Sequence, residues 1–321
     1  MTPRLSILVS VHNHSTALPT LFDSILCQSF KGLEVVVVDD ASTEQYDGLL
    51  NAYRDKGLAI RFHASPRRLY TKDARLKAVE LARGEILTFA DADDVFLGTD
   101  ILEAHVQKFL SSGCDVLHFR TVCIHQDGWQ RNNDWADPFA QELKGDAIFA
   151  AYAPTVTGHL MWNKLYSRQV WLRNLEVAKA IPITICSEDL FLSTWYLFHA
   201  RHYIGSDLVG YAHGYADKTA VKSACRGVAF YIILRDLIPY LEAHGCPSPT
   251  LETLSSRLAA GCQAYINRAC LEAVKNSPLD PAPYGKTNVF AEVPETLLTE
   301  LLLYVNQRNA TQLSSWARDF L

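Results

Sequence analysis

The amino-acid sequence predicts an α/β protein in which a mainly parallel sheet is flanked by helices and followed by a helical C-terminal region. Two observations support this fold class. Within the first 125 residues, short apolar runs alternate with segments of helical spacing, and from about residue 221 onward the pattern is almost entirely helical. We therefore expect two domains, at residues 1–220 and 221–321.

Each expected strand of the first domain is a run of mostly aliphatic residues that ends at polar or turn-forming residues. These runs occupy residues 5–11, 33–38, 58–62, 86–90 and 115–122. Helical spacing fills the intervals between them, at residues 15–28, 45–56, 72–83 and 99–110. Such alternation is typical of parallel strands that are joined by crossover helices.

Beyond residue 125 the pattern is less regular. Residues 126–146 are polar and predict a loop or insertion, residues 147–200 contain helical segments, and residues 201–213 contain a further strand. Three long helices are expected after that, at residues 223–244, 248–276 and 293–319, with a Pro-rich loop before the last of them.

Composition argues against several classes of protein. The formal net charge of the 321-residue chain is -5, so no general basic excess is present to neutralise nucleic-acid phosphates. No apolar run approaches the ~18 residues of a membrane span, and the first residues do not resemble a secretory signal. The 8 cysteines form no C-x-x-C pair, which disfavours a zinc ribbon and predicts buried, reduced thiols in a cytoplasmic protein.

Carboxylates follow two of the expected strands, at residues 39–40 and 91–94. Because parallel strands place their carboxyl ends along one edge of a sheet, we expect both groups to lie there. Asp91 and Asp93 are two residues apart, so in an extended chain they point the same way and can share one divalent ion. A solvated acidic turn explains the same residues without a ligand, and the sequence leaves this alternative open.

Several sequence blocks occur in the order that is found in one enzyme family. They comprise residues 6–13, 35–43, 74–75 and 84–94, followed by residues 162–166 and 187–190. In this order they resemble the family 2 glycosyltransferases of the GT-A fold, over about residues 4–215. The specificity of the resemblance comes from the joint order of the blocks, because each block alone is short.

The resemblance implies an inverting glycosyltransferase. Such an enzyme moves a sugar from a nucleotide-diphospho-sugar, here expected to be a UDP-sugar, to an acceptor hydroxyl with the help of Mn²⁺ or Mg²⁺. The acceptor would be a glycan, a lipid-linked molecule or a protein, in bacterial surface polysaccharide or glycoconjugate synthesis. An alternative is a catalytically silent nucleotide-sugar-binding or scaffold protein of the same fold.

The resemblance also assigns roles to individual residues. The nucleotide site would be formed by Val9, Val11, Asp40, Arg75 and Asp91. The metal ligands would be Asp93, as the principal one, and His213. The general base would be Asp189, with Glu188 as the second choice, and the sugar and acceptor side would be lined by Trp162, Asn163 and Lys164.

Several of these residues also have explanations that need no ligand. Ser187 is a good helix N-cap, and Glu188 and Asp189 would then be first-turn acids that the helix dipole stabilises by about 0.3–1 kcal/mol. Lys164 can be a solvated lysine, and a lone histidine such as His213 is more often packed or exposed than bound to a ligand.

The chain departs from the family at one block. Leu76 follows Ala74 and Arg75 where relatives commonly have Asn, and residues 65–70 contain no glycine. These departures leave the base and ribose contacts of this region open. For the helices after residue 220, three roles stay open: peripheral contact with the inner face of a membrane, assembly of a homo-oligomer, and cover over the acceptor site.

Overall fold

The structure is a computed structural model of residues 1–321, and it describes residues 2–125, 130–132, 136–155, 158–181, 187–215 and 221–275. The chain divides into two compact units. Unit 1 comprises Met1–Thr184 and Glu188–Ala216, and unit 2 comprises Ile185–Ser187 and Asp217–Leu321. The sheet belongs to unit 1, and the long C-terminal helices belong to unit 2.

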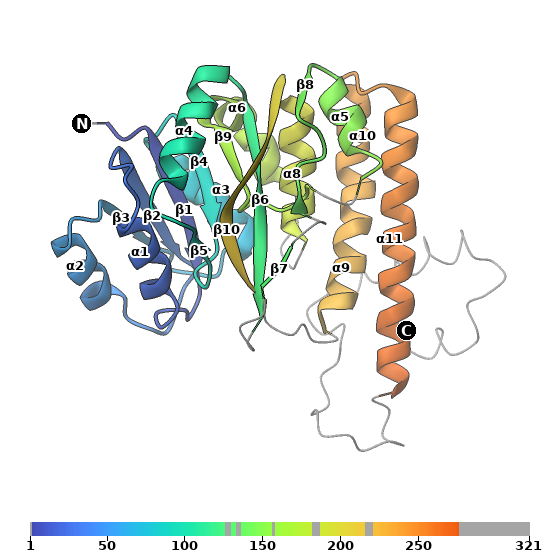
Figure 1. The fold of residues 1–321 in the computed structure, drawn as a ribbon. Helices are drawn as coiled ribbons and strands as arrows, with labels where there is room; N and C mark the ends of the chain where they lie inside the picture. Colours follow the sequence, from blue (N-terminus) through green and yellow to red (C-terminus); the bar gives the residue numbers. More distant parts are fainter. Residues whose placement is uncertain are drawn as a thin grey trace. The chain divides into compact units, whose positions relative to one another are not determined.

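Four parallel strands form one half of the unit 1 sheet (Figure 1). In spatial order they are β3 (Ile60–Ala64), β2 (Leu33–Asp39), β1 (Leu5–Val11) and β4 (Ile86–Ala90). Both faces of β2 are buried, since the valines at residues 35–38 are all 0% exposed. Strands that are covered on both faces are continuously apolar, which is why the sequence predicted this half of the sheet.

The other half of the sheet mixes strand directions. It continues from β4 through β9 (Lys164–Ser167), β6 (Val116–His125), β10 (His202–Tyr215) and β5 (Val95–Phe96). The strands β6 and β10 are parallel to each other, whereas β9 is antiparallel to β4 and β6, and β5 is antiparallel to β10. Two more short strands, β7 (Gln130–Asn132) and β8 (Glu142–Lys144), pair with β6 and β10.

Sequence patterns predicted only β6 and β10 of this second half. The strands β5, β7, β8 and β9 have 2, 3, 3 and 4 residues, too few to show a period of two. The prediction of a loop at residues 126–146 is therefore wrong where β7 and β8 join the sheet.

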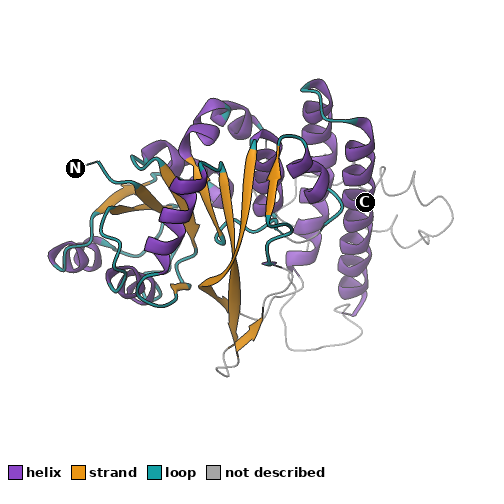
Figure 2. Ribbon diagram, turned by 45° about the horizontal axis from the view of Figure 1, so that its top comes forward, coloured by secondary structure: helices purple, strands orange, loops and turns teal. Residues whose placement is uncertain are grey.

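Helices cover both faces of the sheet (Figure 2). On one face, α1 (Leu18–Leu26), α2 (Asp47–Asp55) and α4 (Ile101–Ser112) share a core with the alternate β1 residues Ile7 and Val9. On the other face, α3 (Tyr70–Leu81) packs on β1 and β2 and contacts α6 (Arg168–Arg173), α7 (Leu175–Ala180) and α8 (Glu188–His199). The helix α5 (Ala147–Tyr152) packs against α8.

The connection from α3 to β4 requires a glycine. A Cβ atom at Gly84 would lie 2.7 Å from the backbone N of Ser6, so β1 leaves no room for a side chain there. The backbone N of Gly84 donates a 2.9 Å hydrogen bond to Ser6 Oγ, which itself donates to Glu34 Oε1 at 2.8 Å. This buried polar contact fixes how closely β4 approaches β1.

The described part of unit 2, residues 221–275, is built on two long helical segments. The helix α9 (Val221–Ile232) continues through a π-helical turn, η2 (Ile233–Leu237), into α10 (Ile238–Ala243), and α11 (Ser248–Lys275) packs against α9. Pro239 at the start of α10 has no backbone N–H to donate, which accounts for the wider turn beside it. The helix predicted at residues 293–319 lies outside the described residues.

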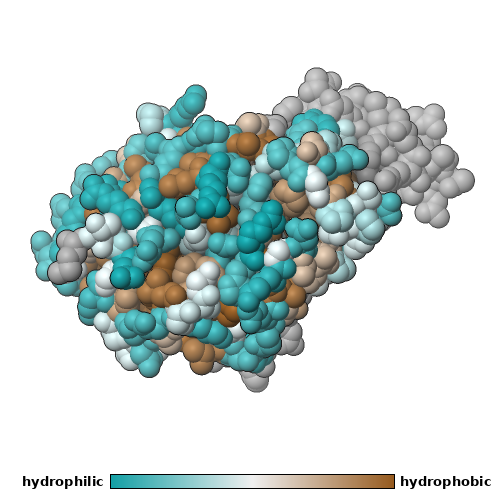
Figure 3. All heavy atoms as spheres, turned by 90° about the horizontal axis from the view of Figure 1, so that it is seen from above, coloured by the Kyte–Doolittle hydropathy of each residue, from teal (hydrophilic) through white to brown (hydrophobic). Residues whose placement is uncertain are grey.

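Hydrophilic residues occupy most of the face drawn in Figure 3, with hydrophobic residues in smaller patches between them. Large hydrophobic side chains are exposed at Tyr70, Leu172, Leu208 and Val209. Among the described residues, no helix is both long and apolar enough to cross a membrane. Buried, reduced thiols occur, as predicted, at Cys114, Cys123, Cys246 and Cys262, whereas Cys27 is exposed.

Candidate active site

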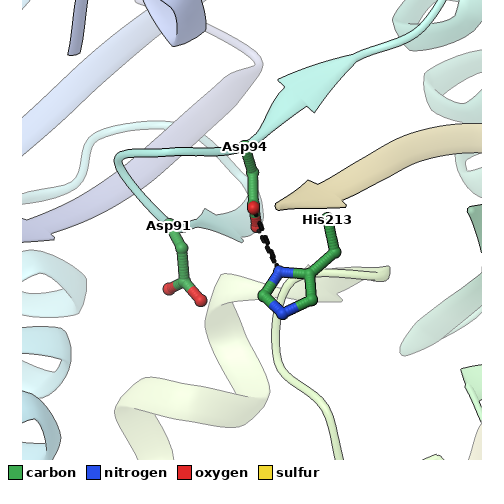
Figure 4. A group of neighbouring side chains, drawn as sticks. All are labelled: Asp91, Asp94 and His213. Atoms are coloured by element: carbon green, nitrogen blue, oxygen red, sulfur yellow. Dashed lines mark hydrogen bonds and ion pairs between the residues drawn. The ribbon is translucent and has the colours of Figure 1, made fainter. Parts of the chain in front are cut away.

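The acidic residues that follow β4 face a histidine from β10. Ligand atoms of Asp91, Asp94 and His213, one from each residue, lie within 4.8 Å of one another (Figure 4). Asp91 and Asp94 stand on the loop between β4 and β5, and His213 lies near the end of β10. These three residues are named the Asp–His cluster below.

Asp94 is the most enclosed member of the Asp–His cluster. Its side chain is 0% exposed and accepts a 3.0 Å hydrogen bond from Nδ1 of His213 and a 2.8 Å hydrogen bond from the backbone N of Gly214. Burial raises the pKa of Asp94 to about 6, although His213 acts in the opposite direction. Burial alone would lower the pKa of His213, but the hydrogen bond and charge of Asp94 raise it overall. Each group thus favours the charged form of the other.

Aromatic stacking fixes the orientation of His213. Its ring stacks on Trp162 with the centroids 4.7 Å apart, and Trp162 stacks on Tyr211 at 5.3 Å. The hydroxyl of Tyr211 accepts a 3.1 Å hydrogen bond from the backbone N of Asp91. Since Nδ1 of His213 is held by Asp94, the imidazole presents Nε2 on its other side.

Arg75 of α3 joins the Asp–His cluster to two carboxylates of α8. Its side chain is 5% exposed, and its guanidinium contacts Asp91 Oδ1 through Nη2 at 2.8 Å and Glu188 Oε1 through Nη1 at 3.2 Å. The same Nη1 also pairs with Asp189 Oδ1. Burial by itself would lower the pKa of Arg75, but the charges of Asp189, Asp91 and Glu188 raise it, so the guanidinium is firmly cationic.

Glu188 and Asp189 occupy the first turn of α8. Burial and the adjacent charge of Asp189 raise the pKa of Glu188 to about 7, while Arg75 lowers it. The two carboxylate side chains are 16% and 21% exposed, so both are partly accessible to solvent. An accessible carboxylate beside a bound hydroxyl can act as a general base.

Asp40 follows β2 and holds the loop that leads into α3. Its carboxylate accepts hydrogen bonds from the backbone N of Leu69 and, at 3.1 Å, from that of Tyr70, and it pairs with Arg68 at 3.4 Å. Its carbonyl oxygen accepts a 2.9 Å hydrogen bond from Nδ1 of His12. The Asp40 carboxylate is therefore already engaged by the protein in this structure.

Backbone strain occurs next to these residues. Positive φ angles of 54°, 55°, 61° and 61° occur at the non-glycine residues Asn13, Ala41, Tyr70 and Ser187. Asn13 follows β1, Ala41 follows Asp40, Tyr70 begins α3, and Ser187 precedes Glu188. Such conformations are found preferentially at functional sites. Ala41 and Ser187 directly adjoin Asp40 and Glu188, two residues that the sequence had singled out.

Other predicted site residues are buried in unit 1. Trp162 is 1% exposed, and Asn163 and Lys164 are 0% exposed. Lys164 Nζ donates to Leu160 O at 2.5 Å and to Asn163 Oδ1 at 2.6 Å, and Asn163 Nδ2 donates to Ala136 O at 2.7 Å. Burial lowers the pKa of Lys164 well below its usual value. The solvated lysine considered from the sequence is therefore wrong for Lys164.

The valines assigned to the nucleotide site are also covered. Val9 and Val11 are 0% and 3% exposed, so their side chains belong to the core and only the adjoining backbone can line a ligand. Lys72, on the same helix as Arg75, donates to Ala178 O and Lys179 O at 3.3 Å each. Its charge thus stabilises the carboxyl end of α7.

The structure brings together Asp91, His213, Arg75, Glu188 and Asp189, which the sequence had singled out, and the predicted residue Trp162 stacks on His213. Asp93 is exposed and stands outside the Asp–His cluster, whereas Asp94 lies inside it. The role of Asp93 as principal metal ligand stays a prediction, and Asp94 is an additional candidate. The roles given to the nucleotide-site, base and acceptor-side residues likewise stay predictions.

Sequence reasoning missed Tyr211 and Gly214, which hold the loop after β4 from the side of β10. Tyr211 and His213 are two residues apart on one strand, so the period of two could have indicated their common face. A Cβ atom at Gly214 would lie 3.0 Å from the backbone oxygen of Asp93. That close approach depends on tertiary packing, so the local sequence does not predict it.

The donor set of the Asp–His cluster fits a divalent cation. Two carboxylates and one imidazole combine hard oxygen ligands with a nitrogen ligand, and divalent metal ions bind ligands of both kinds. The loop that carries Asp91 and Asp94 is held in place by Tyr211 and Gly214, so the cluster is preformed.

Solved structures share this fold. Residues 1–349 of TarS of S. aureus, in complex with UDP-GlcNAc, superimpose with a TM-score of 0.57 at 18% identity, over 95% of this chain and 82% of that TarS fragment. The mannosyltransferase PcManGT of Pyrobaculum calidifontis, in complex with GDP-Man and Mn²⁺, gives a TM-score of 0.56 at 16% identity, over 97% of this chain and 88% of PcManGT. The sheet with its two helical layers is therefore a GT-A fold, as the sequence predicted.

Sequence comparison identifies the family within this fold. Residues 6–171 match the family described as Glycosyl transferase family 2, and the chain belongs to that family. The putative glycosyltransferase EpsH of Bacillus subtilis (strain 168) is 28% identical over 171 residues, which is 53% of this chain and 48% of EpsH. The chain thus matches about half the length of this curated relative.

Proposed function

We propose that the protein is an inverting glycosyltransferase that moves a sugar from a nucleotide-diphospho-sugar to an acceptor hydroxyl. The observation that carries the proposal is the continuous set of contacts from the Asp–His cluster through Arg75 to Glu188 and Asp189. It joins a candidate cation site to a pair of partly exposed carboxylates, and both kinds of group can assist transfer of a sugar from a diphosphate.

The proposed donor is a UDP-sugar. Complexes of TarS with UDP-GlcNAc and of PcManGT with GDP-Man and Mn²⁺ support a nucleotide-sugar as the class of ligand. Asp40, Arg75 and the backbone around Val9 and Val11 would bind the nucleotide, with Asp91 on the ribose side. A base contact by Asp40 would require its present partners in the loop before α3 to move or to share the carboxylate.

A divalent ion, Mn²⁺ or Mg²⁺, would be held by Asp91, Asp94 and His213, with Asp93 as the ligand that the family resemblance favours. When bound, such an ion neutralises negative charge on the leaving diphosphate. Arg75, firmly cationic and fixed between three carboxylates, holds Asp91 toward this position.

Asp189 is the proposed general base, with Glu188 as the second choice. The acceptor oxygen forms a bond to the anomeric carbon while the bond from that carbon to the diphosphate breaks, and the hydroxyl proton passes to the carboxylate. Attack from the side opposite the leaving group inverts the anomeric configuration. Trp162, Asn163 and Lys164 are retained as proposed residues of the sugar and acceptor side, and Trp162 would act there through its contact with His213.

The wider setting is also a proposal. The GT-A domain would span residues 1–220, and residues 221–321 would form a helical domain that contacts a membrane surface or a second copy of the chain. The acceptor would be a glycan, a lipid-linked molecule or a protein in bacterial surface polysaccharide or glycoconjugate synthesis. We place the reaction in the cytoplasm, at the inner face of the membrane when the acceptor is lipid-linked.

A thermal-shift panel tests the proposal. UDP, UDP-sugars and GDP-mannose are added with Mn²⁺ or with EDTA, and release of nucleoside diphosphate is measured in parallel. A donor at about 100 times its Kd should stabilise the fold by about 2.7 kcal/mol, and we expect this only with Mn²⁺. Stabilisation by no nucleotide would contradict the proposal. Stabilisation without any release or transfer, across a panel of acceptors, would favour the catalytically silent binder instead.

A further inference from the structure

One guanidinium stands between the two acidic groups of the candidate site. Arg75 contacts Asp91 with Nη2 at 2.8 Å and Glu188 with Nη1 at 3.2 Å, and it pairs with Asp189 through Nη1. Asp91 also belongs to the Asp–His cluster. A carboxylate has two oxygens, so Asp91 can be shared between Arg75 and a bound cation.

Negative charge exceeds positive charge around Arg75. Three carboxylates contact this one guanidinium, and its side chain is only 5% exposed. A divalent cation at Asp91 would supply positive charge, but it would also repel Arg75 and compete with it for Asp91. The two carboxylates of α8 are the groups that hold Arg75 in place against that repulsion.

We propose that Arg75 is a positioning residue that couples cation binding at Asp91 to the placement of Asp189 and Glu188. This inference rests on the proposed function, because it requires the Asp–His cluster to hold the metal. The guanidinium is a rigid planar fork, so its contact with Asp91 and its contacts with α8 do not change independently.

The coupling has a definite direction. Cation binding weakens the contact between Arg75 and Asp91 and leaves more of the guanidinium charge to Asp189 and Glu188. Conversely, removal of charge from α8 leaves Arg75 more tightly bound to Asp91, and the cation then binds less tightly, because such linkage is reciprocal. The carboxylate that takes the acceptor proton would therefore be set in its final position when the donor side is loaded.

A general electrostatic effect must be separated from this coupling. Loss of any negative charge near a cation site weakens cation binding to some extent. An effect through space would persist, or grow, when Arg75 no longer connects the two sides. An effect transmitted by Arg75 would disappear. A double-mutant cycle distinguishes the two cases.

The test measures the Kd for Mn²⁺ with the full chain, from the electron paramagnetic resonance of free Mn²⁺ at fixed ionic strength. Asp189→Asn should weaken Mn²⁺ binding about five-fold when Arg75 is present. In Arg75→Lys, which keeps the charge and loses the fork, the same substitution should change the Kd by less than about two-fold. The matched control is Asp73→Asn, which removes a 40% exposed carboxylate from the same helix and should also stay within about two-fold.

Thermal unfolding of each variant is recorded, and Arg75→Gln replaces Arg75→Lys as the second background if the lysine variant does not fold. Equal weakening by Asp189→Asn in both backgrounds would overturn the coupling, and so would the absence of weakening when Arg75 is present. If the unchanged protein binds no Mn²⁺, the proposed cation site fails together with the coupling. Failure of the coupling alone leaves Mn²⁺ binding by the unchanged protein intact, so the two failures are distinguishable.

Discussion

The two halves of the unit 1 sheet differ in what they bury. Around β1 and β2 the buried side chains are mostly aliphatic, as at Ile7 and Val36, whereas around β6, β9 and β10 they include His118, Lys164 and Asp94. The first half therefore has a mainly apolar core, whereas the second half buries ionisable groups whose pKa values depend on burial. The candidate site joins the two halves, since it combines the loop after β4 with β10.

The largest effect is expected at this junction. Asp189→Asn should lower kcat by about 10²–10⁴-fold, because the carboxylate that accepts the acceptor proton is lost. Donor affinity at saturating Mn²⁺ should change little, as calorimetric titration with a UDP-sugar would show. Glu188→Gln is the matched variant on the same turn. If Asp189→Asn keeps near-normal turnover while Glu188→Gln does not, Glu188 is the base.

The next effect separates the enclosed carboxylate of the junction from the exposed one. Asp94→Asn should weaken Mn²⁺ binding by about 10–100-fold, because it removes the negative charge of the carboxylate that orients His213. Asp93→Asn should change the Kd by a smaller factor, since Asp93 lies outside the Asp–His cluster. Mn²⁺ titration measures both Kd values. If Asp93→Asn weakens Mn²⁺ binding more than Asp94→Asn does, Asp93 is the principal metal ligand.

Stability should also distinguish the two halves. Lys164→Met should cost about 1–3 kcal/mol of unfolding free energy, because Leu160 O and Asn163 Oδ1 lose the amine that bonds them. Ile7→Val in β1 removes one methylene from a fully buried aliphatic side chain and should cost about 0.5–1.5 kcal/mol. Urea unfolding measures both. A Lys164→Met variant as stable as the unchanged protein would show that the buried amine is dispensable to the second half.

The smallest effect concerns pH. Burial, with a smaller contribution from the charge of Lys108, lowers the pKa of His105 to about 4, and its ring stacks on Phe119 at 4.4 Å. Below pH 6.5 His105 becomes protonated in the unfolded chain but stays neutral in the folded protein. The free energy of unfolding therefore falls as the pH drops from 6.5 toward 4. Between pH 6.5 and 5.5 this contributes about 1 kcal/mol. His105→Phe should reduce the dependence of the free energy of unfolding on pH between 6.5 and 5.5. If that dependence is unchanged in the variant, other groups cause it.

The same division explains what the sequence predicted. The strands at residues 5–11, 33–39 and 86–90 were predictable because each is an apolar run buried on both faces. The strand β9 was not, because 4 residues between two helical segments show no period, and its place depends on pairing with both β4 and β6.

In the candidate site, the order of the sequence blocks led to Arg75, Asp91, Glu188 and Asp189. The enclosure of Asp94 was not predictable, since it arises from contacts with His213 and Gly214, which are 119 and 120 residues away along the chain. Local sequence cannot show which of three neighbouring carboxylates such distant residues will cover.

Diffraction from a crystal grown with Mn²⁺ and UDP, recorded at the manganese absorption edge, tests the central claim most directly. We expect one strong anomalous peak at the Asp–His cluster, in contact with Asp91 and with the diphosphate of the bound nucleotide. A nucleotide bound at the carboxyl ends of β1, β2 and β4 without manganese, or manganese bound only elsewhere, would contradict the account.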